Sequence, residues 1–202
     1  CVNTGECFRV DSDTANLTEE EVRDNWPAVD AADRAELESF NAEGVFALVH
    51  MHSATQRAID VVWVRKRKWV DGKLVFKSRL CIRGFLDPQK HCLPTRSSTA
   101  SRLSQRLLLS ISALCEFEVE SWDVGTAFLK GFNFGKLVEA LRKRGIAMPD
   151  RAVFLQPPNN VWKHFRDMPN CKLKIPKGSE GLWLLKLLKS MYGLNDAPPL
   201  RP

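Results

Sequence analysis

The chain has 202 residues, a hydrophobic fraction of 44% and a formal net charge of +6. This apolar fraction is normal for a chain that buries a core. No run approaches the ~20 consecutive apolar residues that a membrane span needs, so the sequence predicts no membrane partner.

Six cysteines form no Cys-x-x-Cys pair and have no histidine at zinc-like spacing. We interpret them as reduced structural thiols and expect an intracellular protein, in the cytoplasm or the nucleus. The sequence opens with Cys-Val-Asn-Thr-Gly-Glu, which is not a secretory signal and which indicates a chain cut from a longer one.

The charge is unevenly distributed along the chain. Residues 1–60 hold 13 acidic and 4 basic side chains, whereas residues 61–106 hold 12 basic and 2 acidic ones. A basic patch of this size favours a polyanion such as nucleic acid, which it attracts while counterions are released. Basic runs also occur as solvated faces, so the charge alone leaves both interpretations open.

The first elements are a linker, a helix and two strands. Residues 1–25 are polar and acidic and predict a linker. Pro27 suits the first turn of a helix that we expect to run through Phe40, with Gly44 as its end. The apolar runs at 45–49 and 58–64 then predict strands.

A hairpin follows, and it carries most of the positive charge. Residues 69–70 and 73–76 flank Asp71-Gly72, where glycine accepts the positive φ of a tight turn. The second strand continues to Ile82. Such a basic ribbon can lie over phosphates, or it can be an edge hairpin whose charges prevent aggregation.

An amphipathic helix is predicted after the hairpin. Leu103, Leu107, Ile111 and Leu114 recur at spacings of 4, 4 and 3 residues, so we expect this stripe to pack in the core. A serine or threonine at 97–99 can cap the helix.

The remaining segments alternate in type. We predict a strand at 116–124, a small basic helix at 137–144, an extended segment at 153–156, an irregular stretch at 159–180 and an apolar segment at 182–188. The pattern favours an α+β fold, with an antiparallel sheet and helices on one side.

Asp123 closes one apolar segment and opens a Thr-Ala-Phe-Leu turn, so it lies where a strand gives way to a helix. A carboxylate at the end of a strand can hold a divalent metal ion. Phe128, five residues later, can form the floor of a sugar pocket. Taken alone, Phe128 is better interpreted as a core residue beneath a helix.

Several blocks in fixed order resemble the reverse transcriptase of copia-type LTR retrotransposons, over roughly residues 26–198. The matching blocks are Val62-Trp63-Val64-Arg65, Asp71-Gly72, Lys77-Ser78-Arg79-Leu80-Cys81-Ile82-Arg83-Gly84-Phe85, Trp122-Asp123-Val124-Gly125-Thr126-Ala127-Phe128-Leu129-Lys130-Gly131, Gln156-Pro157-Pro158, and the run from Lys186 to Pro198 that contains Tyr192-Gly193-Leu194. The last four residues, 199–202, depart from the family pattern and form an atypical tail.

The resemblance implies the fingers and part of the palm of a right-hand polymerase, a nucleotidyltransferase cut from a Pol polyprotein. It implies RNA-directed DNA synthesis with two Mg²⁺ ions in the complete enzyme. Asp123 would be the catalytic metal ligand, with the carbonyl of Val124 as a second metal contact. The implied partners are an RNA template, a DNA primer and product, deoxynucleoside triphosphates and the remaining Pol segments.

The resemblance also implies roles for other residues. Lys77, Arg79 and Phe128 would bind the incoming nucleotide, with the two cations on one face of a strand and the ring beneath the sugar. Template and primer would contact Arg65, Lys66, Tyr192 and Gly193.

The sequence departs from the family in three respects. Asn195-Asp196 replaces Lys-Gln, residues 132–152 read as an insertion, and the sequence contains no Asp-Asp pair. We therefore expect this chain alone not to polymerise. The alternatives are a non-catalytic nucleic-acid-binding remnant of a decayed retroelement and a structural α+β fragment without a partner.

Overall fold

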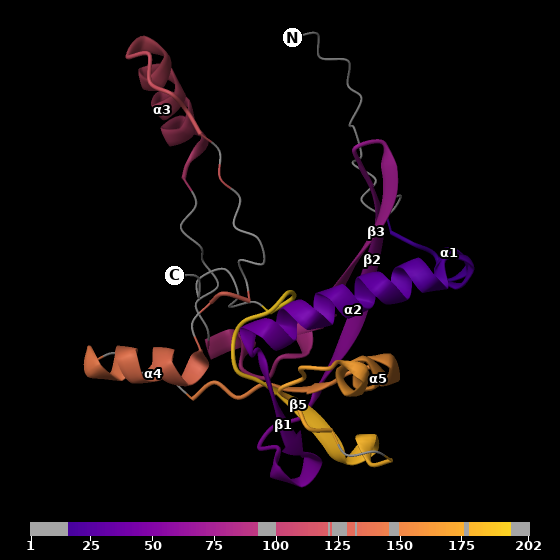
Figure 1. Cartoon of the computed structure of the whole chain (residues 1–202). Coiled ribbons are helices and arrows are strands. Elements are labelled where there is room, and N and C mark those ends of the chain that lie inside the picture. The colour runs from indigo at the N-terminus through magenta and orange to yellow at the C-terminus, as the bar shows by residue number, and fades with distance from the viewer. Residues whose placement is uncertain are drawn as a thin grey trace, which may run out of the picture.

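A five-stranded sheet with the strand order β1-β5-β4-β2-β3 organises the protein (Figure 1). The computed structural model describes residues 16–92, 100–120, 122, 129–131, 133–145, 150–175 and 178–194. The strands are β1 (Phe46–His50), β2 (Ile59–Val70), β3 (Lys73–Ile82), β4 (Phe154–Gln156) and β5 (Trp183–Leu187). The helices are α1 (Glu19–Asp24), α2 (Trp26–Glu43), α3 (Arg102–Leu114), α4 (Phe134–Lys143) and α5 (Asn159–Asp167).

The sheet is mixed, so the prediction of an antiparallel sheet is wrong for one pair of strands. β2 and β4 run parallel, with Ile59 opposite Leu155, while the other pairs of the sheet are antiparallel. Parallel neighbours need a long connection. Here the chain between β2 and β4 includes β3, α3 and α4, which allows β4 to enter the sheet in the same direction as β2.

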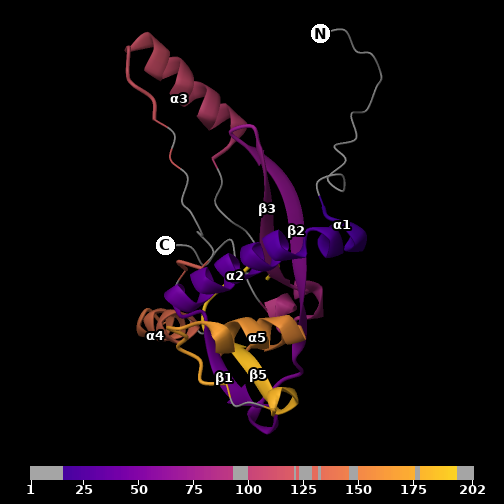
Figure 2. The same ribbon diagram turned by 45° about the vertical axis from the view of Figure 1, so that its right-hand side comes forward.

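The predicted hairpin is confirmed. β2 and β3 pair in register from Val61 opposite Ile82 to Val70 opposite Lys73. Asp71 and the glycine after it both have positive φ, 50° and 74°, as a two-residue turn that matches the strand twist requires. Figures 1 and 2 show the tip of this hairpin rising beyond α2, clear of the rest of the sheet.

α2 and α5 cover the same face of the sheet. The Phe46 ring of β1 stacks on Phe40 of α2 at 5.2 Å and meets Phe165 of α5 edge-on at 6.1 Å. Leu37 and Trp162, from the same two helices, are at most 1% exposed. The predicted first helix is confirmed: α2 runs to Glu43, and Gly44 caps it at φ 60°, as expected.

Two predictions about irregular segments are wrong. Part of the expected linker forms α1, because Thr18 and Glu21 make a reciprocal capping box at its start. The stretch expected to be irregular at 159–180 begins with α5, whose Val161 and Phe165 are fully buried. Both helices are short, so their apolar periodicity is too brief to stand out in the sequence.

α3 forms as predicted, but its environment and its cap differ from the prediction. Ser101 caps the helix rather than a residue at 97–99. The expected core stripe is exposed, with Leu103 at 77% and Leu114 at 84%. The strand expected at 116–124 is absent from the described residues 116–120, since no neighbouring strand lies there to pair with them.

The small basic helix predicted at 137–144 and the extended segment predicted at 153–156 are confirmed in outline. α4 carries Arg142 and Lys143 in its last turn, and Gly145 follows with φ 75°. β4 ends at Gln156, immediately before two prolines. Across the described ranges, no helix combines the length and the apolar character that crossing a membrane requires.

Candidate functional site

The end of β3 and the segment around Tyr192 meet at the edge of the sheet. The backbone N–H of Ile82 donates to the carbonyl of Tyr192 at 2.9 Å. The guanidinium of Arg79 lies over the Tyr192 ring, 5.3 Å from its centroid. Arg79, which the resemblance assigned to the nucleotide, and Tyr192, which it assigned to template and primer, are therefore neighbours.

This contact depends on two glycines. A Cβ at Gly84 would lie 2.0 Å from the carbonyl oxygen of Gly193, and a Cβ at Gly193 would lie 2.1 Å from the carbonyl oxygen of Ile82. Gly193 also has φ 95°, which L side chains rarely adopt. The backbones can approach this closely only because neither residue has a side chain. The resemblance identified Gly193 as a site residue but included Gly84 only as a member of a matching block, without a role.

A cationic groove runs along one face of the hairpin. Lys66 lies directly opposite Lys77, and Val64 lies directly opposite Arg79. Paired residues of an antiparallel ladder share a face, so these cations project to the same side, as predicted for Lys77 and Arg79. The groove encloses about 340 Å³ and is lined by Val64, Lys66, Arg67, Lys68, Lys77, Arg79 and Cys81.

None of the described residues that line the groove is acidic. Among the described residues, neither Lys66 nor Lys77 forms a salt bridge. Like charges directly opposite one another on two strands repel. The groove is therefore suited to an anion with several negative oxygens, which would relieve that repulsion.

Glu36 of α2 interacts electrostatically with Arg79 and Lys77 of this groove, and nothing in the sequence indicated it. Burial raises the pKa of its carboxyl, while the backbone N–H of Leu80 and the charges of Arg79 and Lys77 oppose that rise. Its Oε1 atom is buried and has no hydrogen-bond partner among the described residues. Burial also raises the pKa of Tyr192, and the Glu36 charge adds to that rise. A glutamate on an amphipathic helix gives no sequence signal that separates it from a solvated charge.

Arg65 points to the other face of the hairpin, toward α2. Its guanidinium donates to both carboxylate oxygens of the fully buried Asp33, at 3.1 and 2.6 Å. It also lies over the rings of Trp26 and Trp63, at 5.9 and 5.4 Å. The predicted template residues Arg65 and Lys66 therefore lie on opposite faces of β2.

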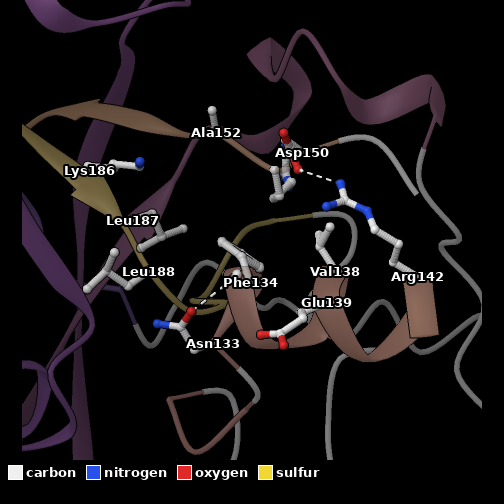
Figure 3. Close-up of a pocket in the computed structure, with 12 residues that line it drawn as sticks. Asn133, Phe134, Val138, Glu139, Arg142, Asp150, Ala152, Lys186, Leu187 and Leu188 are labelled. Atoms are coloured by element: carbon white, nitrogen blue, oxygen red, sulfur yellow. Dashed lines mark hydrogen bonds and ion pairs between the residues drawn. The ribbon is translucent and has the colours of Figure 1, made fainter. Parts of the chain in front are cut away.

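A separate hollow of about 550 Å³ lies beside α4 (Figure 3). It shares no lining residue with the cationic groove. Arg142 and Asp150 face each other across its rim at 3.8 Å. Its charges are mixed, so it gives no single preference for an anion.

The buried ion pair beside this hollow joins distant segments of the chain. Arg151 contacts Asp87 with both side chains 1% exposed, and its Nη1 donates to Oδ1 at 3.1 Å. The same guanidinium lies over the Phe134 ring at 5.7 Å. This pair fixes the segment before β4 to the turn that follows β3.

The predicted catalytic and metal residues Asp123 and Val124, and the predicted nucleotide residue Phe128, lie outside the described residues. The segment that follows them is described. Leu129 is fully buried, and its carbonyl accepts from Nζ of Lys189 at 3.4 Å. Phe134 N–H donates to the Leu188 carbonyl at 2.9 Å. The part of the chain that the structure describes contains no group of three or more His, Cys, Asp or Glu that could hold a metal ion.

Comparison with known proteins supports a retroelement origin, because the chain is similar to a retrovirus-related Pol polyprotein. That relative is the Retrovirus-related Pol polyprotein from transposon TNT 1-94 of Nicotiana tabacum, 37% identical over 168 residues. The matched segment covers 81% of this chain and 10% of the curated relative. No protein-family model matches the chain. No solved structure matches it either.

Proposed function

We propose that the chain is the fingers and partial palm of a retroelement reverse transcriptase, in an α+β arrangement of the right-hand polymerase type. Two findings support this proposal: the similarity to a transposon Pol polyprotein and the presence of a cationic groove on a protruding hairpin. The activity proposed for the complete enzyme is RNA-directed DNA synthesis.

One observation carries the proposal: blocks that resemble the polymerase family, although distant in sequence, meet in space. Arg79 and Gly84 of one block contact Tyr192 and Gly193 of another. The end of the Asp123 block is held beside the same segment, because Leu129 accepts a hydrogen bond from Lys189. The meeting of two of these blocks at the β3 edge of the sheet, with the third block joined to the same C-terminal run, is expected of an active site and is not required for a solvated basic face.

In this proposal the described cations bind phosphates. Arg79 and Lys77 hold the triphosphate of a deoxynucleotide, and Lys66 adds positive charge from the opposite strand. The Tyr192 ring lies beneath the Arg79 guanidinium and limits the directions it can take. Arg79 is thereby positioned before the anion arrives, which lowers the entropic cost of binding.

The remaining predicted residues complete the site. Asp123 and the Val124 carbonyl are hard oxygen donors, as Mg²⁺ requires, and Phe128 would lie beneath the sugar. Metal chemistry there would help the primer 3′-hydroxyl attack the α-phosphate and would stabilise charge on the phosphate oxygens. Template and primer would pass between Lys66 and the segment of Tyr192 and Gly193.

Nucleotide binding by single variants tests this proposal. Binding of a fluorescent deoxynucleoside triphosphate is measured by anisotropy for the wild-type chain and for Arg79→Ala. Loss of hydrogen bonds between charged groups costs about 1.5–3 kcal/mol, so we expect roughly 10- to 150-fold weaker binding.

Lys73→Ala is the matched control. Lys73 is an exposed cation of the same strand but lies outside the lining of the groove. We expect its binding to change less than about twofold, because distant exposed charges are screened. Equal losses for the two variants would mean that the hairpin attracts anions only through its total charge, and the proposed nucleotide site would be wrong.

A further inference from the structure

The apolar stripe of α3 is exposed along its whole length. Only one of the 13 residues of this helix is buried. The exposed stripe consists of Leu103, Leu107, Ile111 and Leu114. The described residues from 103 to 122 include nine large apolar side chains that are 44% to 84% exposed. In Figures 1 and 2 the helix lies away from α2 and α5, the helices that cover the sheet. Monomeric soluble proteins rarely expose so many neighbouring apolar side chains, so the stripe marks an interface.

The length of α3 also favours a partner surface. A helix of 13 residues is about 20 Å long, and isolated helices of this length are only marginally stable in water. The hydroxyl of Ser101 caps the first turn by accepting from the N–H of Ser104 at 3.0 Å. The later turns gain little from packing while the stripe is exposed. Covering the stripe would stabilise the helix by removing apolar area from water.

The charges on the two ends of α3 are opposite in sign. Arg102 and Arg106 lie in the first half of the helix, whereas Glu116, Glu118 and Glu120 follow its last turn. Among the described residues, none of these five side chains takes part in a salt bridge. When two copies of such a helix meet antiparallel, the basic end of each lies beside the acidic end of the other. The surface is therefore self-complementary, as a two-fold interface requires.

We propose that the α3 stripe is an antiparallel interface between two copies of this chain. Leu103 of each copy then lies opposite Leu114 of the other. The same register places Arg102 beside Glu116 of the second copy. The described residues between 102 and 122 are about as many as one side of a standard protein interface holds, roughly 20.

A lipid surface fits this helix less well than a second copy does. Helices that lie on membranes carry mainly lysine and arginine on their polar side, whereas three acids directly follow α3. The interface uses none of the residues that line the cationic groove. It therefore does not rest on the proposed nucleotide site.

Sedimentation equilibrium tests the proposal. We expect the wild-type chain to sediment at about 100 μM with twice its monomer mass of 22.9 kDa, because interfaces of this size have micromolar or tighter affinity. Leu107→Gln puts an amide into the stripe of both copies, so we expect at least about 100-fold weaker dimerisation. Circular dichroism checks that the variant keeps its helix content. Leu109→Gln is the matched control, because Leu109 is also exposed but lies on the opposite side of the helix, and it should dimerise nearly as wild type does.

Charge reversal tests the antiparallel arrangement. One variant combines Arg102→Glu with Arg106→Glu, and the other combines Glu116→Arg with Glu118→Arg. Each variant alone places like charges at both ends of its dimer, so we expect at least about tenfold weaker dimerisation. When the two variants are mixed in equal amounts, each supplies the charges that the other lacks, and they should form heterodimers about as tight as the wild-type dimer.

Three results would overturn the proposal: a wild-type chain that stays monomeric, an equal loss of dimerisation for Leu107→Gln and Leu109→Gln, and charge variants that stay monomeric when mixed. A monomeric wild-type chain would leave the stripe to another segment of the Pol polyprotein or to a lipid surface. Because Arg79→Ala tests the nucleotide site separately, either proposal can fail while the other stands.

Discussion

Replacing Gly193 by alanine tests whether the contact between two distant backbones holds the site together. The new Cβ would lie 2.1 Å from the carbonyl oxygen of Ile82, 3.0 Å from its nitrogen and 3.1 Å from its carbonyl carbon. All three atoms belong to the backbone of β3, so no flexible side chain can move aside. One of the two segments must shift.

The expected cost has two parts. Gly193 has φ 95°, and holding alanine at positive φ costs about 1–2 kcal/mol. The shift also lengthens the hydrogen bond from Ile82 to Tyr192, now 2.9 Å, whose net contribution is about 0.5–1.5 kcal/mol. We therefore expect Gly193→Ala to lower the free energy of unfolding by roughly 1.5–3.5 kcal/mol.

Urea unfolding followed by tryptophan fluorescence measures this change, and three other glycines separate its causes. Gly72 has φ 74°, and a Cβ added there would have nothing within 4 Å, so its alanine variant reports backbone strain alone. Gly84→Ala reports the cost of the close backbone approach without positive φ. Gly181 has neither positive φ nor a close neighbour, so Gly181→Ala should leave the free energy of unfolding nearly unchanged. If Gly193→Ala proves no more destabilising than Gly72→Ala, the two backbones do not meet as described.

Two further predictions concern buried charges. Asp87→Asn removes the carboxylate charge from the ion pair with Arg151, in which both side chains are 1% exposed, so we expect urea unfolding to show a loss of about 3–5 kcal/mol. Glu139→Gln breaks the exposed pair with Lys143 and should cost under about 1 kcal/mol; similar losses for both variants would contradict the burial argument. Burial raises the pKa of Glu36 above 4.5 in the folded protein, so the folded state holds this proton more tightly than the unfolded state does, and the protein loses stability as the pH rises above about 4.5. Glu36→Gln should therefore be more stable than wild type at neutral pH, and the difference in stability between the two proteins should shrink below about pH 4.5. If urea unfolding gave the same pH profile of stability for both proteins, this prediction would be wrong.

The elements that the sequence predicted well are those fixed by local chemistry. The hairpin follows from Asp71-Gly72 between two strand-forming runs, because its turn needs positive φ at both positions. α2 follows from a proline at its start and Gly44 at its end. The alternation of side chains along β3 placed Lys77 and Arg79 on one face before any fold was known.

The elements that the sequence missed depend on partners elsewhere in the chain. Periodicity identified α3, but the burial of Leu103 depends on which elements pack against the helix. Within the described residues little of the chain packs against α3, and Leu103 is exposed. The parallel pairing of β4 with β2 is likewise a property of the long connection, not of the strand. The approach of Gly84 to Gly193 joins two blocks whose sequences show no sign of contact.

Arg65 and Lys66 show how the geometry separates residues that the sequence treated alike. Arg65 donates to both oxygens of Asp33, which is 0% exposed. A polyanion that drew Arg65 away would leave a buried carboxylate without its cation, a change that costs several kcal/mol. Lys66 lies on the opposite face, exposed and directly across from Lys77, where a phosphate would relieve repulsion between the two ammonium groups. We therefore expect nucleic acid to contact Lys66, while Arg65 fixes the hairpin to α2 and so sets the direction in which the groove faces.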